Sequence, residues 1–76
     1  MKMQELDIRG EVCPFTFVKS KIAIESMQVG EVLRVLVDYE PSARSVPKSM
    51  QEEGQEVIAV NKLDENLWEI ILRRVK

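Results

Sequence analysis

Residues 6–14 read Leu-Asp-Ile-Arg-Gly-Glu-Val-Cys-Pro, and this stretch joins the first predicted strand to the first predicted helix. Apolar and polar side chains alternate over residues 3–9, which predicts a short strand. Gly10 then interrupts the alternation. Proline is favoured in the first turn of a helix, because its missing N–H has no intrahelical partner there. The sequence therefore predicts a helix that begins at Pro14, with Cys13 as its N-cap.

Further along the chain, the sequence predicts one more strand and one more helix. The first helix is expected to span residues 14–28. Residues 32–37 are almost continuously apolar and rich in valine, which is typical of a strand that is buried on both sides or central in a sheet. A second helix is predicted over residues 46–53, with Ser45 as its cap and Pro47 in its first turn.

Two final strands, over residues 55–60 and 67–75, are predicted to form a hairpin through a polar loop at residues 61–66. The order is βαβαββ without a repeat or linker, so residues 1–76 are expected to form one domain. Right-handed crossovers would place both helices on one face of a four-stranded mixed sheet. The predicted fold class is α+β, a two-layer α/β sandwich.

The composition limits the possible functions. The chain has 76 residues and a formal net charge of −2, which argues against a dedicated nucleic-acid-binding protein. It contains no histidine, so His-based triads and imidazole metal sites are excluded, and a single thiol argues against zinc. No metal or other cofactor is therefore expected. The N-terminal residues lack the apolar run of a signal peptide, and no stretch is long enough for membrane insertion, so we expect a reducing, cytoplasmic location.

Cys13 is the only cysteine, and its predicted place at a helix N-terminus favours the thiolate. Unpaired backbone N–H groups and the positive end of the helix dipole stabilise an anion there. Arg9, Lys19 and Lys21 would add positive charge nearby, whereas Glu11 would oppose it. Free cysteines are more often small buried hydrophobic residues, so a structural role for Cys13 stays open.

The chemistry open to a single thiol is narrow. A disulfide oxidoreductase normally needs a second, resolving cysteine, and a cysteine hydrolase needs a general base such as histidine. A sulfur carrier needs only one thiol, which accepts a sulfane sulfur as a persulfide and passes it on. These requirements favour sulfur carriage on Cys13, by a relay protein rather than a self-sufficient enzyme.

The first predicted helix carries two apolar stripes. One stripe surrounds Ser20 and consists of Phe17, Ala23, Ile24 and Met27. The other consists of Phe15, Val18 and Ile22. The first stripe is expected to face the sheet. Two interpretations of the second stripe remain open: a surface beside Cys13 on which a partner protein docks, and a face that packs against the second helix.

The chain resembles the TusA/SirA-like family of sulfur-carrier proteins over nearly its whole length. The motifs that carry the resemblance are Leu6-Asp7-Ile8-Arg9-Gly10, Cys13-Pro14, Lys19 with Lys21, Gly30-Glu31, Asp38, Val46-Pro47 and Gly54. The resemblance implies the βαβαββ fold and a Cys13 persulfide that is handed between proteins. It also implies a protein sulfur donor, such as a cysteine desulfurase, a rhodanese-like protein or a sulfur transporter, and a protein acceptor.

Three positions depart from the pattern of that family: Thr16 within the cysteine motif, Met50 where some relatives have a second cysteine, and Gln55 in place of a histidine. Thr16 stands where the pattern Cys-Pro-x-Pro has its second proline, so the first turn of the helix regains an N–H. This variation leaves open which pathway the sulfur serves. It does not change the expected role as a carrier. The residues expected to support the site around the cysteine are Arg9, Gly10, Pro14, Lys19 and Lys21.

Two other functions are compatible with the same fold. In the first, the chain is a non-catalytic interaction or regulatory module, and Cys13 is structural. In the second, it binds nucleic acid, since a similar fold occurs in the C-terminal domain of bacterial translation initiation factor 3. The acidic pI, about 5.1, counts against the second function.

Overall fold

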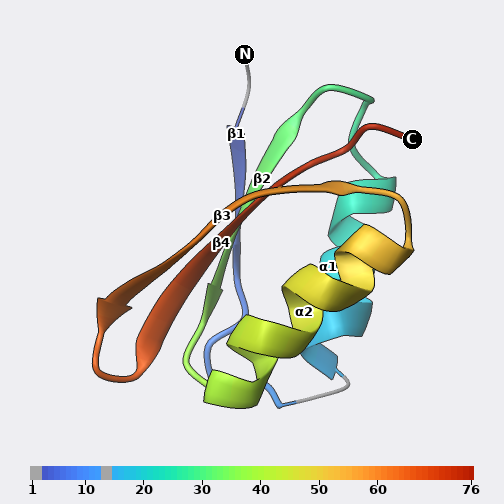
Figure 1. The fold of residues 1–76 in the computed structure, drawn as a ribbon. Coiled ribbons are helices and arrows are strands. Elements are labelled where there is room, and N and C mark those ends of the chain that lie inside the picture. The colour runs from blue at the N-terminus through green and yellow to red at the C-terminus, as the bar shows by residue number, and fades with distance from the viewer. Residues whose placement is uncertain (1–2, 13–14) are drawn as a thin grey trace.

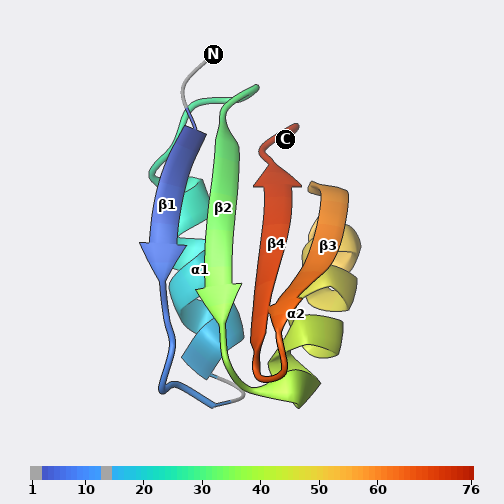
Figure 2. The same ribbon diagram turned by 90° about the vertical axis from the view of Figure 1, so that its left-hand side faces the viewer.

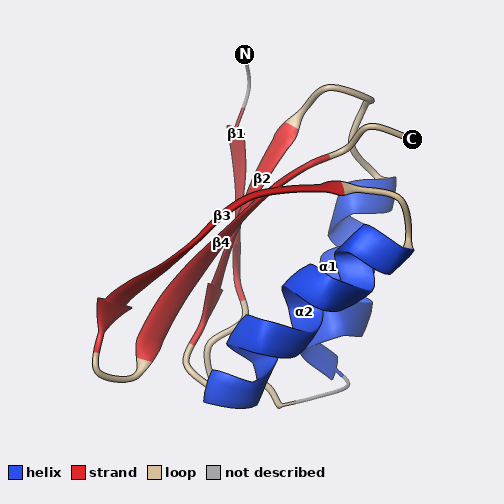
Figure 3. Ribbon diagram, viewed as in Figure 1, coloured by secondary structure: helices blue, strands red, loops and turns tan. Residues whose placement is uncertain are grey.

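Two layers make up the fold: a mixed sheet of four strands and, on one face of it, two helices (Figures 1 and 3). The computed structural model describes residues 3–12 and 15–76. The strands are β1 (Met3–Asp7), β2 (Val32–Val37), β3 (Glu56–Asp64) and β4 (Leu67–Arg73). The helices are α1 (Phe15–Glu25) and α2 (Glu40–Glu52). The predicted βαβαββ order and the α+β two-layer sandwich are confirmed.

The strands lie in the order β1-β2-β4-β3 across the sheet (Figure 2). β1 runs parallel to β2, with Leu6 opposite Val35. β4 is antiparallel to both of its neighbours, and its Ile70 lies opposite Val35 on β2 and Val60 on β3. The C-terminal ends of β1 and β2 therefore meet at the same end of the sheet, where the chain segments that follow them come into contact.

The hydrophobic core lies between the sheet and the helices. The two central strands contribute alternate buried side chains: Leu33, Val35, Val37, Trp68, Ile70 and Leu72. Helix α2 contributes Val46 and Met50, and α1 contributes Ile24. Because side chains alternate along a strand, the neighbouring residues of the central strands point to the helix-free face.

The helix-free face carries a ladder of polar side chains across all four strands. Arg34 on β2 binds Glu5 on β1 at 2.7 Å and Glu69 on β4 at 2.6 Å. Asn61 on β3 donates a hydrogen bond to Glu69 at 3.0 Å. The hydrogen bonds from Arg34 and Asn61 lower the pKa of Glu69. Of the two interpretations of residues 32–37, the central strand is confirmed, because β2 lies between β1 and β4 and its Arg34 side chain forms ion pairs on the helix-free face.

Helix α2 begins at Glu40, so the predicted later start with Ser45 as the cap is wrong. Pro41 lies at the beginning of the helix, where its missing N–H has no intrahelical partner to lose. Pro47 lies inside the helix rather than in its first turn. The longer helix gains burial, because Ala43 joins the side chains that pack against the core.

The C-terminus of α2 is a Schellman motif. Gly54 adopts a φ of 90° and donates its N–H to the Gln51 carbonyl at 3.0 Å. The N–H of Gln55 reaches back to the Met50 carbonyl at 2.9 Å. Two of the last carbonyls of α2 are thereby satisfied, at a position where the positive φ favours glycine.

The hairpin between β3 and β4 is longer than predicted. β3 extends through most of the residues expected to form a loop, 61–66, and the turn consists of Glu65 and Asn66 alone. Polar residues fit in this strand because it is an edge strand with solvent beside it. One of these polar residues, Lys62, forms a cation–π interaction: its ammonium group lies 5.7 Å from the centre of the Trp68 ring.

Helix α1 ends at Glu25, earlier than predicted, because the C-terminal segment of the chain caps it. The side chain of Arg74 donates hydrogen bonds to the carbonyl groups of Ile24, Glu25 and Met27. A cation at this end of a helix also complements the helix dipole. β4 stops one residue before Arg74, short of its predicted end, because that residue turns toward α1.

Replacement of Arg74 with methionine should lower the free energy of unfolding by about 1.5–3 kcal/mol, because the last carbonyls of α1 lose charge-assisted hydrogen bonds. Urea unfolding followed by circular dichroism measures this loss. Arg73→Met is the matched control, since the Arg73 side chain pairs with Glu56 at the protein surface. Equal losses in the two variants would contradict the capping role of Arg74.

Candidate functional site

The candidate site lies between β1 and α1, and Cys13 and Pro14 themselves lie outside the described residues. Their described neighbours are both open to solvent, Val12 with an exposed fraction of 46% and Phe15 with 58%. The Val12 carbonyl accepts the N–H groups of Phe15, at 2.9 Å, and Thr16, at 3.4 Å. These two N–H groups are therefore already used at the start of the helix, and fewer backbone donors are left for an anion than the sequence predicted.

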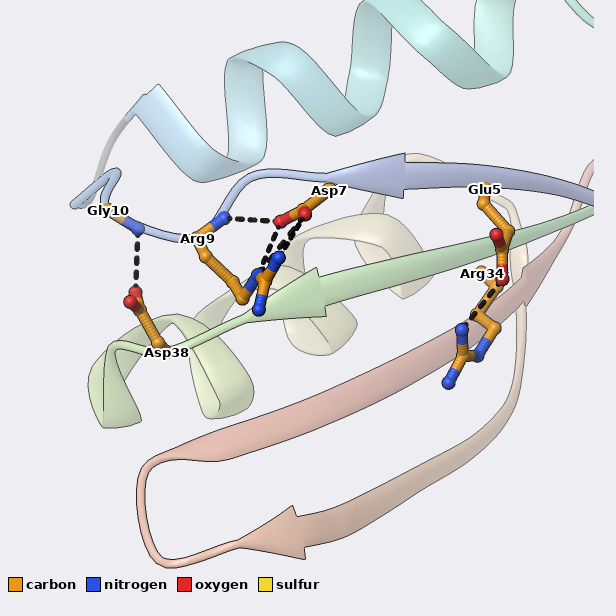
Figure 4. Close-up of polar contacts among 6 residues, drawn as sticks. All are labelled: Glu5, Asp7, Arg9, Gly10, Arg34 and Asp38. Carbon is orange, nitrogen blue, oxygen red and sulfur yellow. Dashed lines mark hydrogen bonds and ion pairs between the residues drawn. The ribbon is translucent and has the colours of Figure 1, made fainter.

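The segment after β1 begins with an anchored turn (Figure 4). Ile8 is buried, and its N–H donates to the Leu36 carbonyl at 3.0 Å. β1 ends at Asp7, earlier than predicted, because the Asp7 carboxylate accepts the backbone N–H of Arg9 at 3.1 Å and turns the chain. The Arg9 guanidinium also binds this carboxylate, at 2.7 Å, and these hydrogen bonds lower the pKa of Asp7.

Gly10 ties this turn to the end of β2. Its N–H donates to Oδ1 of Asp38 at 2.8 Å (Figure 4). The φ of Gly10 is 90°, a conformation that other residues rarely adopt. Around the bond lies an open depression of about 490 Å³, lined by Asp7, Arg9, Gly10 and Asp38. Asp38 was not among the candidate site residues, although it is one of the residues that carry the family resemblance and it directly follows the predicted strand 32–37.

Each of the three cations expected to support the site lies next to a carboxylate. The pairs are Arg9 with Asp7 at 2.7 Å, Lys19 with Glu11 at 3.1 Å, and Lys21 with Glu53 at 2.8 Å. The hydrogen bond to Glu53 raises the pKa of Lys21. Exposed pairs of this kind contribute little to stability. The positive charge expected around the cysteine is thus balanced by carboxylates of the described residues.

The second apolar stripe of α1 is exposed. Its members have exposed fractions of 58% (Phe15), 44% (Val18) and 63% (Ile22). The interpretation that this stripe packs against α2 is therefore wrong. The first stripe faces the core, as predicted: Ser20, Ile24 and Met27 are buried, and Phe17 and Ala23 pack against the core residues.

Helix α1 meets α2 through small polar side chains. Thr16 and Ser42 are both fully buried, and their hydroxyl oxygens lie 2.9 Å apart in a hydrogen bond. The hydroxyl of Ser20, one turn further along α1, donates to the Thr16 carbonyl at 2.8 Å. The threonine that departs from the Cys-Pro-x-Pro pattern therefore joins the two helices next to the site, a role that the sequence pattern did not predict.

Replacement of Thr16 with valine keeps the shape of the side chain and removes its hydroxyl, which should cost about 1 kcal/mol of unfolding free energy. Ser42→Ala should also destabilise the protein, and the double variant should lose less than the sum of the two, because both changes remove the same bond. Urea unfolding of the three variants measures this coupling. Strictly additive losses would contradict a direct bond between the hydroxyls.

Two further properties of the described residues bear on the site. Within residues 3–12 and 15–76, no group of three or more His, Cys, Asp and Glu side chains is placed to hold a metal ion. None of the helices formed by these residues is long and apolar enough to cross a membrane.

Comparisons with known proteins agree on one family. A family model described as "Sulfurtransferase TusA" matches residues 4–74. A protein of Archaeoglobus fulgidus is 52% identical over 69 residues, which cover 91% of this chain and 78% of that protein. A protein of Thermotoga maritima is 37% identical over 68 residues, which cover 90% of this chain and 86% of that protein. Both relatives bear the name "Putative sulfur carrier protein".

The fold is shared with a solved structure as well. The crystal structure of the SirA-like protein from Desulfitobacterium hafniense matches with a TM-score of 0.83. The match covers 99% of this chain and 100% of that chain, at 24% sequence identity. At this level of identity the likeness establishes the fold alone.

Proposed function

This chain belongs to the sulfurtransferase TusA family, and we propose that it accepts a sulfane sulfur on Cys13 as a persulfide and relays it to an acceptor protein. The main supporting observation is the setting of the cysteine, which follows exposed Val12 and precedes exposed Phe15 at the start of α1. A thiol that exchanges sulfur with other proteins needs such open surroundings. The two relatives bear the name "Putative sulfur carrier protein", which adds support.

In the loading step, the Cys13 thiolate attacks the terminal sulfur of a donor persulfide, R–S–SH. A new S–S bond forms between Sγ of Cys13 and that sulfur. The S–S bond of the donor breaks, and its electron pair leaves with the donor thiolate, R–S⁻. The proton stays on the transferred sulfur, so no external oxidant or reductant is needed. In the unloading step, an acceptor thiolate is the nucleophile and Cys13 is the leaving group.

The proposal makes the chain a relay protein that depends on partner proteins. The donor is a cysteine desulfurase, a rhodanese-like protein or a sulfur transporter, and the acceptor is a protein thiolate. The chain has no histidine that could take the proton from a thiol. Each reacting thiol must therefore be kept as a thiolate by the groups around it. We assign no cofactor to the reaction. We place the protein in the cytoplasm, because a reducing compartment keeps a single thiol free of disulfides.

The residues that shape the chain around the cysteine are, in this proposal, Arg9, Gly10 and Pro14. Gly10 supplies the turn with positive φ, and Arg9 closes the same turn by binding Asp7. Pro14 is included because proline is generally favoured in the first turn of a helix. Together they would present Cys13 at a defined point of the surface.

Lys19 and Lys21 support the site through their charge in this proposal. Their carboxylate partners, Glu11 and Glu53, offset that charge in the isolated chain. Because exposed ion pairs contribute little, an acidic partner protein can take over either lysine at little cost. The two lysines would therefore contribute to partner binding more than to the reactivity of the thiol.

The loading step can be tested with the reduced protein and a small donor, glutathione persulfide. We expect intact-mass analysis to show a gain of one sulfur atom that dithiothreitol removes, because the Cys13 thiolate takes up the sulfane sulfur. Cys13→Ser should show no gain. Iodoacetamide should label Cys13 in the native protein, without prior unfolding.

A different result would favour the interaction module over the carrier. If the mass does not change with several sulfane-sulfur donors and Cys13 reacts with iodoacetamide only in urea, the cysteine is structural. A gain of mass that persists in Cys13→Ser would contradict the assignment of the sulfur to this residue.

The apolar stripe of α1, defined as Phe15, Val18 and Ile22, is the proposed docking surface for the donor protein. It begins directly after the Cys-Pro pair and continues along the outer side of the helix. A donor that seats on this stripe would bring its persulfide close to Cys13. Lys19 and Lys21 flank the stripe, so we expect the donor to surround its contact area with acidic groups.

The docking role predicts that Phe15→Ser and Ile22→Ser slow sulfur transfer from a persulfidated cysteine desulfurase by about tenfold, as loss of an apolar anchor would. Loading from glutathione persulfide should stay unchanged, because the small donor needs no docking surface. Stopped reactions analysed by mass give both rates. Ile58→Ser is the matched control, since Ile58 is exposed to 48% on β3. Unfolding of the α1 variants, or equal slowing with both donors, would contradict docking at this stripe.

A further inference from the structure

We propose that Asp38 is a positioning residue of the sulfur site. It holds the segment that leads to Cys13 against the end of β2, by accepting the N–H of Gly10. This inference rests on the proposed function, because positioning matters only if Cys13 reacts. The sequence motif around Cys13 suggests site residues from that part of the chain only. Asp38 would be a further site residue, and it comes from the segment after β2.

The bond continues the parallel pairing of β1 and β2 beyond the ends of the strands. The last paired residues are Asp7 and Leu36. The N–H of Ile8 then donates to the Leu36 carbonyl at 3.0 Å. Beyond this point the Asp38 carboxylate takes the Gly10 N–H at 2.8 Å (Figure 4). The Asp38 side chain thus replaces the strand carbonyl as the acceptor for the departing chain.

The other contacts of this segment stay close to β1 or reach α1: the Glu11 N–H donates to the Ile8 carbonyl at 3.2 Å, and the Glu11 carboxylate pairs with Lys19. Gly10 has no atom within 4 Å of the place that a Cβ would take, so packing does not hold it there. Arg9 is exposed, and its guanidinium turns back to the end of its own strand. Among the described residues, the bond to Asp38 is the only hydrogen bond from residues 9–12 to the end of β2. This bond is therefore the described contact that ties the segment before Cys13 to the end of β2.

The charge of Asp38 favours a hydrogen-bonding role over an electrostatic one. A carboxylate disfavours a neighbouring thiolate, so any effect of the Asp38 charge on Cys13 would hinder the reaction. An ionised acceptor, however, forms a stronger hydrogen bond with a backbone N–H than a neutral acceptor does. In this proposal, Asp38 therefore helps the reaction by holding the backbone of Gly10 in place.

The test compares Asp38→Ala, which removes the acceptor, with Asp38→Asn, whose amide oxygen accepts the same bond without the charge. Asp64→Ala is the matched control. Asp64 also accepts a backbone N–H, that of Glu65 at 2.8 Å, but it does so in the turn between β3 and β4. The two readouts are the hydrogen exchange rate of the Gly10 amide, followed by NMR, and the rate of Cys13 loading from glutathione persulfide.

In Asp38→Ala, we expect exchange of the Gly10 amide to become about tenfold faster and loading to become about three- to tenfold slower, because the segment is no longer held in place. Asp38→Asn should stay within about twofold of the wild type in both readouts, since it keeps the bond. Asp64→Ala should change neither readout.

Unchanged exchange of the Gly10 amide in Asp38→Ala would overturn the inference, and so would faster exchange with unchanged loading. Equal losses in Asp38→Asn and Asp38→Ala would overturn it too, because the charge would then be the active feature. Should Asp38→Ala fail to fold, Asp38→Ser takes its place, since its shorter side chain does not reach Gly10, and the same losses are expected. Failure of the wild type to load would instead refute the proposed function, whereas the exchange of the Gly10 amide reports on the bond alone.

Discussion

The parallel pairing of β1 and β2 is the constraint on which the site depends. Parallel strands need a connection that crosses back over the sheet, and here that connection contains the cysteine and α1. Because both strands point the same way, their C-terminal ends lie together, and Gly10 comes within hydrogen-bonding distance of Asp38. A shift of one residue in this register would turn the side chains of β1 to the other face and remove the geometry of the site.

Helix α1 is fixed near both of its ends by side chains from distant parts of the chain. Thr16 binds Ser42 in the layer between the helices, and Arg74 caps the last carbonyls of α1. With both ends held and Ile24 buried in the core, the helix cannot rotate to bury its apolar stripe. A fixed helix with one apolar side exposed is compatible with the proposed docking of a donor protein on that side.

Local rules predicted most of the fold but little of the site. Residues 32–37 form the predicted strand with the predicted ends, because a run of buried residues between polar ones defines a central strand. The start of α2 was missed because Pro41 and Pro47 both suit a first helical turn, and only packing against the sheet decides between them. The bond between Gly10 and Asp38 spans 28 positions, so no local pattern encodes it. It follows from the strand order, which single-sequence periodicity does not define.

Sulfur carriage requires that the chain gives up the sulfur that it accepts. The most direct measurement loads Cys13 with radiolabelled sulfane sulfur, removes the donor, and adds a reduced protein with an accessible thiol as the acceptor. The proposed function predicts that the label appears on the acceptor at the rate at which the Cys13 persulfide disappears. Label that stays on the chain, or that leaves only as free sulfide while the acceptor remains unlabelled, would contradict it.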